Sequence, residues 1–363
     1  MSHPVAIAQH PPFFPNIVGR LKPMKRILLS FFLVVALLPT LFGQSGGEAV
    51  FSFLQLTNSA KTAAMGGLQV ALPDADPDLV LQNPALLSPE MSKKLSVNYT
   101  NYLAGIGFGS GSYARDLGKF GMAAIGIQFM DYGQFVAADE NGLITGSFGA
   151  SDYALNLTWA KSLGNGLTVG ASIKPIYSHL ENYRSFGIAA DLGIARHSAD
   201  QLTSYALCFK NIGSQLTTYY DGGSHEKIAW SLQMGCTKKL QFAPLRFSVT
   251  AYDLNRWNRT VSATDPNGII VANEGQSPFS SVMRHLTFGA EIFPEKKVTF
   301  RIGYNFRRHE DLYVAGQTGL VGFTTGLGIN LSPVSFNYAL SGYYQGSLVQ
   351  NFSLSVNLSG IIK

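Results

Sequence analysis

Residues 153–160 read Tyr-Ala-Leu-Asn-Leu-Thr-Trp-Ala, and the pattern in this stretch decides the fold. Large apolar side chains occupy every second position, and small or polar side chains occupy the positions between them. Because successive side chains of a strand point to opposite faces, this spacing predicts a β-strand with one apolar face and one small, polar face.

The same alternation recurs from residue 94 almost to the end of the chain. The second face carries Gly, Ser, Thr and Asn rather than the many Lys and Glu of a soluble outer surface, which is typical of a barrel with lipid outside and a polar lumen. We therefore predict an all-β fold, a transmembrane antiparallel β-barrel of about 14 strands over residues 94–363. The predicted strands are 94–103, 106–116, 119–131, 151–162, 167–179, 184–196, 201–212, 227–238, 244–256, 284–293, 297–307, 320–331, 334–343 and 350–359.

The connections between these strands alternate in length. The long ones are 132–150, 213–226, 257–283 and 308–319, and short turns separate the intervening strands. In bacterial barrels the short turns face the periplasm and the long loops face outward, so we expect cell-surface loops and periplasmic termini in a Gram-negative outer membrane. The run Met122-Ala123-Ala124-Ile125 interrupts the alternation and predicts a β-bulge that would open the wall laterally.

Composition supports this membrane setting. Charged residues make up 13% of the 363 residues, about half of the usual share in soluble proteins, whereas aromatic residues make up 12%. The net charge of +5 includes four basic residues within residues 1–43, which contain no acid, so the remainder carries only +1. This distribution argues against a nucleic-acid-binding protein.

The N-terminal segment resembles an export signal. Met24-Lys25-Arg26 precedes a largely apolar run over residues 27–38, too short to cross a bilayer comfortably. We assign residues 24–43 to a signal peptide, with a membrane anchor as the alternative, and regard residues 1–23 as a misassigned extension. The two cysteines, Cys208 and Cys236, are too few for a disulfide framework, and we expect both thiols to be free and to face lipid.

Residues 44–93 do not alternate and predict a hatch that fills the lumen, because a barrel of this size has a wide interior. Adjacent glycines permit a tight backbone path, and the Asn-Pro pair predicts a turn. The motif residues are Ala63, Ala64, Met65, Gly66, Gly67, Asp74, Asp76, Asn83, Pro84 and Ala85.

Two further sets of residues are candidates for structural or binding roles. Isolated charges on the polar strand faces predict a lumenal ion-pair network, made of Lys174, Asp191, His285, Glu291 and Arg301. Aromatic and basic residues near the outer strand ends suit a membrane interface or lipopolysaccharide phosphates, with solvated loop charges as the alternative. This second set is Arg256, Trp257, Arg259, Arg307, Arg308, Tyr343 and Tyr344.

No motif predicts catalysis, a metal site or a cofactor. Gly43-Gln44-Ser45-Gly46-Gly47 matches an esterase pattern, but it lies at the signal cut rather than between a strand and a helix. Gly105, Gly107, Gly109 and Gly111 suggest a phosphate-binding loop, but no helix follows, so we expect a small-residue lumen face. The histidines lack metal-ligand spacing. The sequence therefore favours a protein that is not an enzyme.

The segment from residue 63 to residue 87, with its Gly-Gly, acidic pair and Asn-Pro-Ala, resembles the hatch of the fatty-acid-transporter (FadL-like) outer-membrane barrels. Residues 48–115 resemble the PorV/PorQ family of the type IX secretion system more closely, the PorQ branch in particular. The similarity rests on Phe53-Leu54-Gln55-Leu56, Ser59-Ala60-Lys61, 63–67, 82–87 and 98–104. Lys61 departs from the usual Arg, which keeps the charge but not a bidentate contact.

The resemblance implies a non-enzymatic barrel that anchors a surface partner, PorZ, within an attachment complex. This complex also contains a sortase and a PorV-like shuttle, and it processes secreted cargo and joins it to anionic lipopolysaccharide. The alternative implied by the wider class is a channel for hydrophobic small molecules. The expected partners are thus outer-membrane lipid, lipopolysaccharide and attachment-complex proteins, and not nucleic acid.

Overall fold

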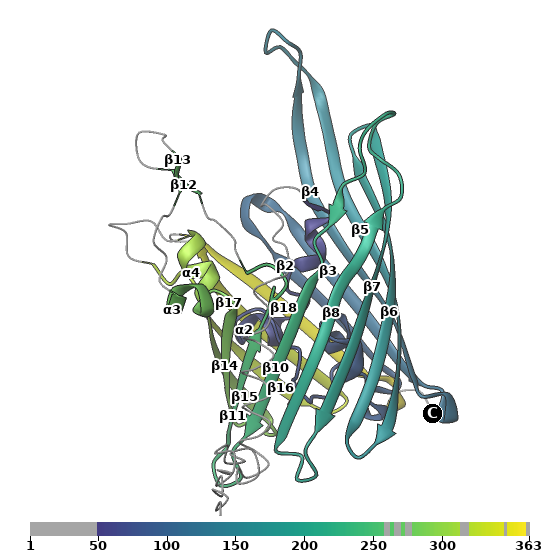
Figure 1. The fold of residues 1–363 in the computed structure, drawn as a ribbon, viewed down its shortest axis with the longest axis vertical. Helices are drawn as coiled ribbons and strands as arrows, with labels where there is room; N and C mark the ends of the chain where they lie inside the picture. Colours follow the sequence, from purple (N-terminus) through teal and green to yellow (C-terminus); the bar gives the residue numbers. More distant parts are fainter. Residues whose placement is uncertain are drawn as a thin grey trace, which may run out of the picture. The chain divides into compact units, whose positions relative to one another are not determined.

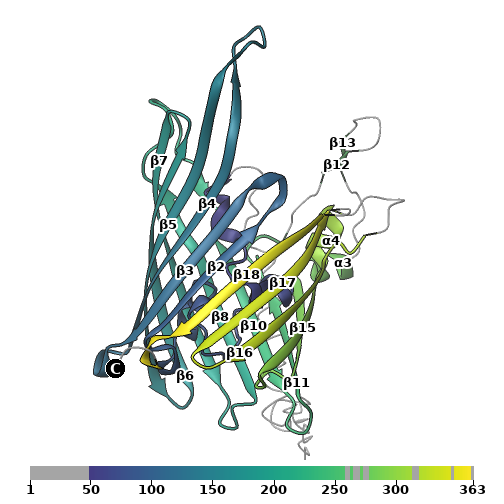
Figure 2. The same ribbon diagram turned by 180° about the vertical axis from the view of Figure 1, so that it is seen from behind.

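The structure, a computed structural model, describes residues 49–257, 262–264, 270–272, 278–312, 319–344 and 347–360. Fourteen antiparallel strands form a closed barrel in which each strand pairs with the next, and the last pairs with the first (Figures 1 and 2). They are β2 (Lys94–Asn101), β3 (Gly107–Asp116), β4 (Met122–Ala138), β5 (Ile144–Gly164), β6 (Leu167–Leu180), β7 (Tyr183–His197), β8 (Thr203–Gln215), β10 (Ser231–Lys239), β11 (Leu245–Ala251), β14 (Leu286–Ile292), β15 (Val298–Asn305), β16 (Phe323–Leu331), β17 (Val334–Tyr344) and β18 (Ser347–Asn357).

Shorter elements accompany the barrel. β1 (Ala49–Val50) pairs with β9 (Lys227–Ile228), and β12 (Ser262–Thr264) pairs with β13 (Ile270–Ala272). The helices are α2 (Ala60–Ala64), α3 (Pro278–Met283) and α4 (Phe306–Leu312), and short 3-10 helices cover Ser52–Gln55, Pro77–Leu81, Pro84–Leu86, Pro89–Met91, Leu103–Gly105, Gly118–Phe120 and Leu358–Gly360. No helix in the described residues has the length and apolar character needed to cross a bilayer.

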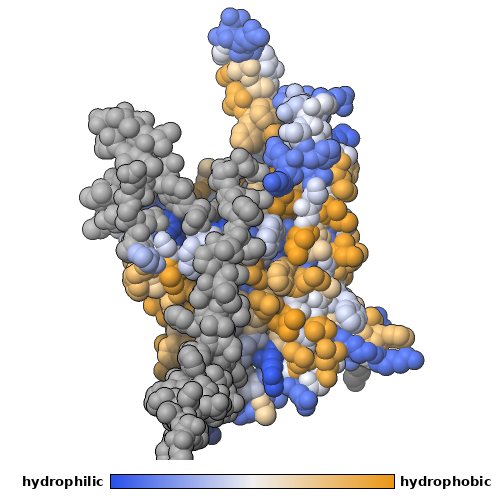
Figure 3. Space-filling view, in the orientation of Figure 1, coloured by the Kyte–Doolittle hydropathy of each residue, from blue (hydrophilic) through white to orange (hydrophobic). Residues whose placement is uncertain are grey.

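The barrel wall has two faces, as the alternation predicts. On β4, Ile125, Ile127 and Phe129 are exposed, while Gly126 and Gln128 between them are buried. The same alternation holds on β7, where Ile188 and Leu192 point outward. Figure 3 shows apolar residues gathered over the middle of the wall and polar residues at the tips. Because the apolar side chains face outward, the exterior is suited to lipid and the polar groups line the interior.

The wall differs in height around the barrel. β4 and β5 contain 17 and 21 residues, whereas β11 and β14 contain 7 each. Long connections and tall hairpins lie at one end, the long-loop end, and the turns after β3, β5, β7 and β16 lie at the other, the short-turn end (Figure 1). The tall side projects furthest at the β4–β5 hairpin.

All fourteen predicted strands are present, but several details of the prediction are wrong. The predicted loop 132–150 is mostly strand, because Phe135 pairs with Phe148 and continues the ladder beyond the barrel. β11 ends at Ala251 rather than at residue 256, since Asp253 adopts a left-handed backbone conformation with φ 53°. The predicted loop 308–319 begins within α4.

The predicted bulge at residues 122–125 is also wrong. β4 pairs with both β3 and β5 without interruption from Met122 to Asp131, and its register with β5 shifts beyond this stretch, between Asp131 and Gln134 and between Ala137 and Ala138. The small side chains of Ala123 and Ala124 weaken the apolar alternation without changing the direction in which each residue points. The irregularity therefore lies at the rim of the barrel rather than within its wall.

The sequence also predicts the wrong face for two sets of small residues, Cys208 and the glycines of β3. Cys208 is buried against the hatch, with its Sγ 3.8 Å from the Gln82 carbonyl oxygen, because the larger Leu207 and Phe209 take the outward face of β8. The glycines of β3 face outward rather than into the lumen. The ring of Phe129 covers Gly109, which leaves no room for a Cβ there.

Candidate functional site

The interface between the hatch and the barrel wall is the candidate site. Residues 51–93 form short helices inside the barrel, where α2 contacts β15–β18 and the 3-10 helix Pro84–Leu86 contacts β5–β7. Asn83 caps this helix, because its Oδ1 accepts a hydrogen bond from the Ala85 N–H at 3.0 Å. Pro84 occupies the first helical position, where no amide hydrogen is needed. The Asn-Pro-Ala motif thus fixes the hatch backbone locally.

A ring of glycines on the lumen face lets the hatch approach the wall backbone closely. A Cβ at Gly303 of β15 would lie 2.2 Å from the Gly66 amide nitrogen, and one at Gly193 of β7 would lie 2.0 Å from Oδ1 of Asn83. Similar contacts within 3.0 Å involve Gly126, Gly170, Gly235, Gly289 and Gly326, each against a hatch residue between Ala64 and Pro84. Since any larger side chain would occupy the space of the hatch, these positions determine how the hatch fits.

The hatch is hydrogen-bonded to the wall on many sides. The Gly66 amide donates to Thr324 Oγ1 on β16 at 3.0 Å, and the Gly66 carbonyl oxygen accepts from Asn305 on β15. Further bonds join Ala60 to Ser353 of β18, Asp78 to Ser96 of β2, Asn58 to Ser110 of β3 and to Gln128 of β4, and Leu81 to Lys210 of β8. The hatch is therefore held across the whole circumference rather than along one wall.

A buried ion network links the hatch to three adjacent strands. Arg246 of β11 donates to both carboxylate oxygens of Asp74, at 2.7 and 2.9 Å, and also contacts Glu291 of β14. Arg301 of β15 lies 2.8 Å from Glu291, and Lys61 lies 3.1 Å from both Asp74 and Asp76. Because each of these charges has an oppositely charged neighbour, the network offsets the desolvation that burial imposes.

The other predicted lumen charges lie elsewhere. Lys174 of β6 and Asp191 of β7 form a separate buried pair at 2.5 Å, beside a register shift in β8 at Asn211. Asp191 accepts from the Asn211 amide at 2.7 Å, and Lys174 donates to the Asn211 side chain, so the pair supports that irregular backbone. His285 does not join the Glu291 network, because it lies at the rim immediately before β14.

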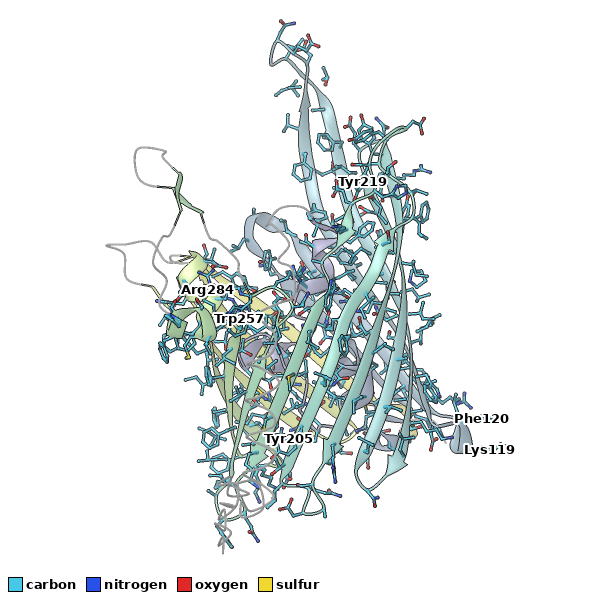
Figure 4. All side chains as sticks on the ribbon, in the orientation of Figure 1. Lys119, Phe120, Tyr205, Tyr219, Trp257 and Arg284 are labelled. Carbon is cyan, nitrogen blue, oxygen red and sulfur yellow. The ribbon has the colours of Figure 1, made fainter. Side chains whose placement is uncertain are left out.

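The rim beside α3 and α4 gathers the predicted basic and aromatic residues (Figure 4). Trp257 stacks on His285 with ring centroids 4.7 Å apart, and Arg307 lies over Tyr252 while pairing with Asp253 at 2.6 Å. Additional contacts place Arg308 over Tyr343, Arg256 against Asp253, and Arg284 against Glu310 and Asp311. Arg259 and the side chain of Tyr344 lie outside the described residues.

A polar pocket of about 300 Å³ opens between the hatch and the wall near the short-turn end. Its charged lining is made of Lys61, Asp74, Asp76, Lys94 and Arg301, and the turn between β16 and β17 completes it. Around the start of the hatch, by contrast, Phe51, Phe53 and Leu54 pack with apolar wall residues that include Phe108 and Ile176. The interior thus has an apolar cluster in one part and a charged pocket in another.

Asp78 gives the hatch a pH-dependent contact. Burial, followed by the neighbouring charge of Asp76, raises the pKa of Asp78 to about 7, while Ser96 and Ser112 donate hydrogen bonds to its carboxylate. The folded protein therefore retains a proton between about pH 4 and pH 7 that the unfolded chain has released. Stability is thus lost as the pH rises through this window.

We expect Asp78→Asn to remove this pH dependence, because the amide keeps the shape of the side chain without a charge. Urea unfolding of the detergent-solubilised protein at pH 5 and pH 8 measures the effect. From pH 5 to pH 8 the free energy of unfolding should fall more in the wild-type chain than in the variant. An equal decrease in both proteins would contradict the assignment.

Several of these residues were absent from the sequence-based candidates. Arg246, at the centre of the hatch network, lies on a strand whose polar face carries little other charge, and the sequence alone does not indicate that two chain-distant acids, Asp74 and Glu291, meet there. Lys61 belongs to the Ser-Ala-Lys motif, but the motif does not indicate its pairing with Asp74 and Asp76. In the described residues, no group of three or more His, Cys, Asp or Glu side chains is placed to hold a metal ion.

No protein-family model matches the chain, and no curated protein matches it. Among solved structures, it resembles the deltaS2 mutant of the TodX monoaromatic hydrocarbon channel, with 14% identity and a TM-score of 0.50 over 83% of this chain and 97% of that one. It is also similar to the Pseudomonas putida toluene transporter TodX, with 13% identity, 87% and 97% coverage and a TM-score of 0.48. A Pseudomonas aeruginosa FadL homologue has 11% identity, 83% and 97% coverage and a TM-score of 0.45.

The first of these likenesses shows that the chain shares the fold of that channel. Together with the closed barrel and its apolar exterior, it identifies the protein as a bacterial outer-membrane β-barrel with an N-terminal hatch.

Proposed function

We propose that this protein is a non-conducting outer-membrane barrel that anchors a surface protein of the type IX secretion system. In this proposal the long-loop end faces the cell surface and holds a PorZ-like partner. A sortase and a PorV-like shuttle complete the attachment complex, which joins secreted cargo to anionic lipopolysaccharide. The barrel itself supplies position and carries out no chemistry.

The attachment of the hatch to the wall around the circumference carries this proposal. Opening a path would break hydrogen bonds worth about 1 kcal/mol each. It would also separate buried ion pairs, each of which costs about 3–5 kcal/mol when one partner is removed. The contacts of Lys210 with Leu81 and of Ser353 with Ala60 lie on β8 and β18, which are on opposite sides of the barrel in the strand order. A fixed hatch favours a function that resides on the outer surfaces of the barrel.

The choice of partner rests on the sequence of the hatch and the first strands. The resemblance to the PorQ branch covers residues 48–115, and the Asn-Pro-Ala part of it forms the helix cap described above. The closely packed Gly66 and Gly67 belong to the same set of motifs. The residues that carry the resemblance are thus also those that seat the hatch.

Deleting the gene in the bacterium that encodes this chain tests the proposal. We expect the PorZ-like protein to leave the outer membrane and to accumulate, correctly folded, in the culture medium, because its membrane anchor is lost. Immunoblots of membrane and medium fractions measure the redistribution, and re-expression of the wild-type chain serves as the control. Unchanged surface retention in the deletion strain would contradict the proposed function.

The apolar cluster at the start of the hatch favours a second function, a channel for hydrophobic small molecules. Phe51 and Phe53 meet Phe108 and Ile176 there, and the fold is shared with the TodX monoaromatic hydrocarbon channel. A channel would raise toluene uptake by liposomes that contain the purified barrel, whereas an anchor would not. Empty liposomes provide the baseline for this comparison.

A further inference from the structure

The β4–β5 hairpin extends well beyond the barrel as a two-stranded ribbon. Along β4 the alternation of buried and exposed residues ends at Met130, and along β5 it begins at Ala150. Between them, nearly every residue from 133 to 149 is exposed or partly exposed on both faces of the ribbon. Figure 1 shows this ribbon rising above the neighbouring strands, so it stands clear of the membrane-spanning wall.

This ribbon carries exposed apolar side chains above the level of the neighbouring strands (Figure 1). Val136, Leu143 and Ile144 are 66%, 69% and 71% exposed. Phe135 stacks on Phe148 across the two strands, with ring centroids 5.3 Å apart. Figure 3 shows the apolar stretch beneath a polar tip. Exposed apolar clusters rimmed by polar residues mark sites that contact a protein or a membrane, and the position of the ribbon above the neighbouring strands favours a protein.

The ribbon is also preformed. Asp139 closes its tip, because its carboxylate accepts hydrogen bonds from the amides of Asn141 and Leu143 at 2.9 and 2.8 Å. The Asp139 amide in turn donates to the Leu143 carbonyl oxygen. A two-stranded ribbon in water is only marginally stable, so covering its apolar faces would stabilise it. A preformed surface loses less conformational entropy when it binds.

The charge of the ribbon selects the kind of partner. Its exposed charges are the acids Asp139 and Glu140, Asp131 lies just below it on β4, and the sequence contains no basic residue between Lys119 and Lys161. These three acids form no ion pair within the part of the chain that the structure describes. The arginines beside α3 and α4, on the other side of the same rim, lie against acids such as Asp253 and Asp311. The ribbon therefore repels anionic lipopolysaccharide and attracts basic surfaces.

We propose that the β4–β5 ribbon, residues 133–149, is the docking element for a surface protein that presents an apolar patch bordered by basic residues. Identifying that protein as PorZ-like rests on the proposed function. The apolar side chains of Val136, Leu143 and Ile144 form the centre of the contact, and the acids at the tip steer the approach.

Titration of the purified PorZ-like protein of the same bacterium against the detergent-solubilised full-length barrel tests the inference. Val136→Ser with Ile144→Ser should weaken binding about tenfold or more, because two apolar side chains lose their buried surface. Asp139→Asn with Glu140→Gln keeps the turn acceptor at residue 139 but removes both charges. This second variant should bind more slowly, and its association rate should depend much less on the salt concentration.

Leu180→Ser with Glu181→Lys, at the tip of the neighbouring β6–β7 hairpin, is the matched control and should bind like the wild-type chain. Heat-dependent migration on gels verifies that each barrel is folded. Equal binding by the wild-type chain and both ribbon variants would overturn the inference while leaving the proposed function intact. The inference would also fall if the variants lost binding to lipopolysaccharide vesicles instead. A wild-type barrel that does not bind the PorZ-like protein would reject the proposed function together with this assignment.

Discussion

Replacing Gly303 by valine is expected to displace the hatch from its seat against β15. A Cβ at this position would lie 2.2 Å from the Gly66 amide nitrogen and 2.4 Å from the Met65 carbonyl carbon. Both are backbone atoms of the hatch, and neither can move aside without a shift of α2 and the Gly-Gly segment that follows it. Overpacking in a tightly packed interior usually costs about 1–3 kcal/mol, and the added γ-methyl groups extend the clash further.

Limited proteolysis of the purified barrel measures this effect. The hatch of the variant should be cleaved between residues 60 and 90 while the barrel strands remain intact, and ion conductance in planar bilayers should rise. Gly111→Val provides the control, because a Cβ at Gly111 of β3 has only one neighbour, at 3.5 Å. A Gly303→Val protein with a protected hatch and wild-type conductance would show that the glycine ring does not determine the fit of the hatch.

Replacing Glu291 by alanine is expected to lower the free energy of unfolding by about 3–5 kcal/mol. The Glu291 carboxylate is completely buried and lies between Arg246 and Arg301. Without it, Arg301 keeps its hydrogen bond to Asn337 but loses its ion pair, and the two guanidinium groups repel each other in a low-dielectric interior. The decrease in the free energy of unfolding should therefore exceed the decrease caused by an ordinary polar substitution.

Urea titration of the detergent-solubilised protein, followed by tryptophan fluorescence, gives the unfolding free energy. Glu295→Ala is the matched control, because Glu295 pairs with Lys239 on the exposed short-turn end. Exposed ion pairs of this kind contribute about 0–1 kcal/mol. Similar losses in both variants would mean that the lumenal network stabilises the barrel no more than a surface contact does.

The sequence predicts the strands well because lipid imposes one requirement on every strand of the wall. Leu155, Leu157 and Trp159 face hydrocarbon. Their spacing therefore predicts both that this segment is a strand and which of its faces points outward. The predicted face was wrong where the size of the side chain, rather than its polarity, decided whether a residue points outward. Cys208 points inward beside Leu207 and Phe209, which fill the outward positions.

The candidate site was predictable only in part. The charges of Lys174, Asp191, Glu291 and Arg301 identify residues on the polar face, but their partners depend on strand register and on the path of the hatch. Arg246 gains its role from Asp74, which lies 172 residues away in the chain. Local sequence contains no information about such a contact, because the contact depends on strand register and on the path of the hatch through the closed barrel.

The amino-acid sequence by itself determined the number of strands and the alternation of apolar and small or polar residues along them, since both follow from how neighbouring residues partition between lipid and water. Only the tertiary structure decided which glycines receive the hatch, which charges pair across it, and that residues 133–149 form a projecting ribbon. Those features arise from the relative positions of segments distant in the chain, which barrel closure and strand register fix.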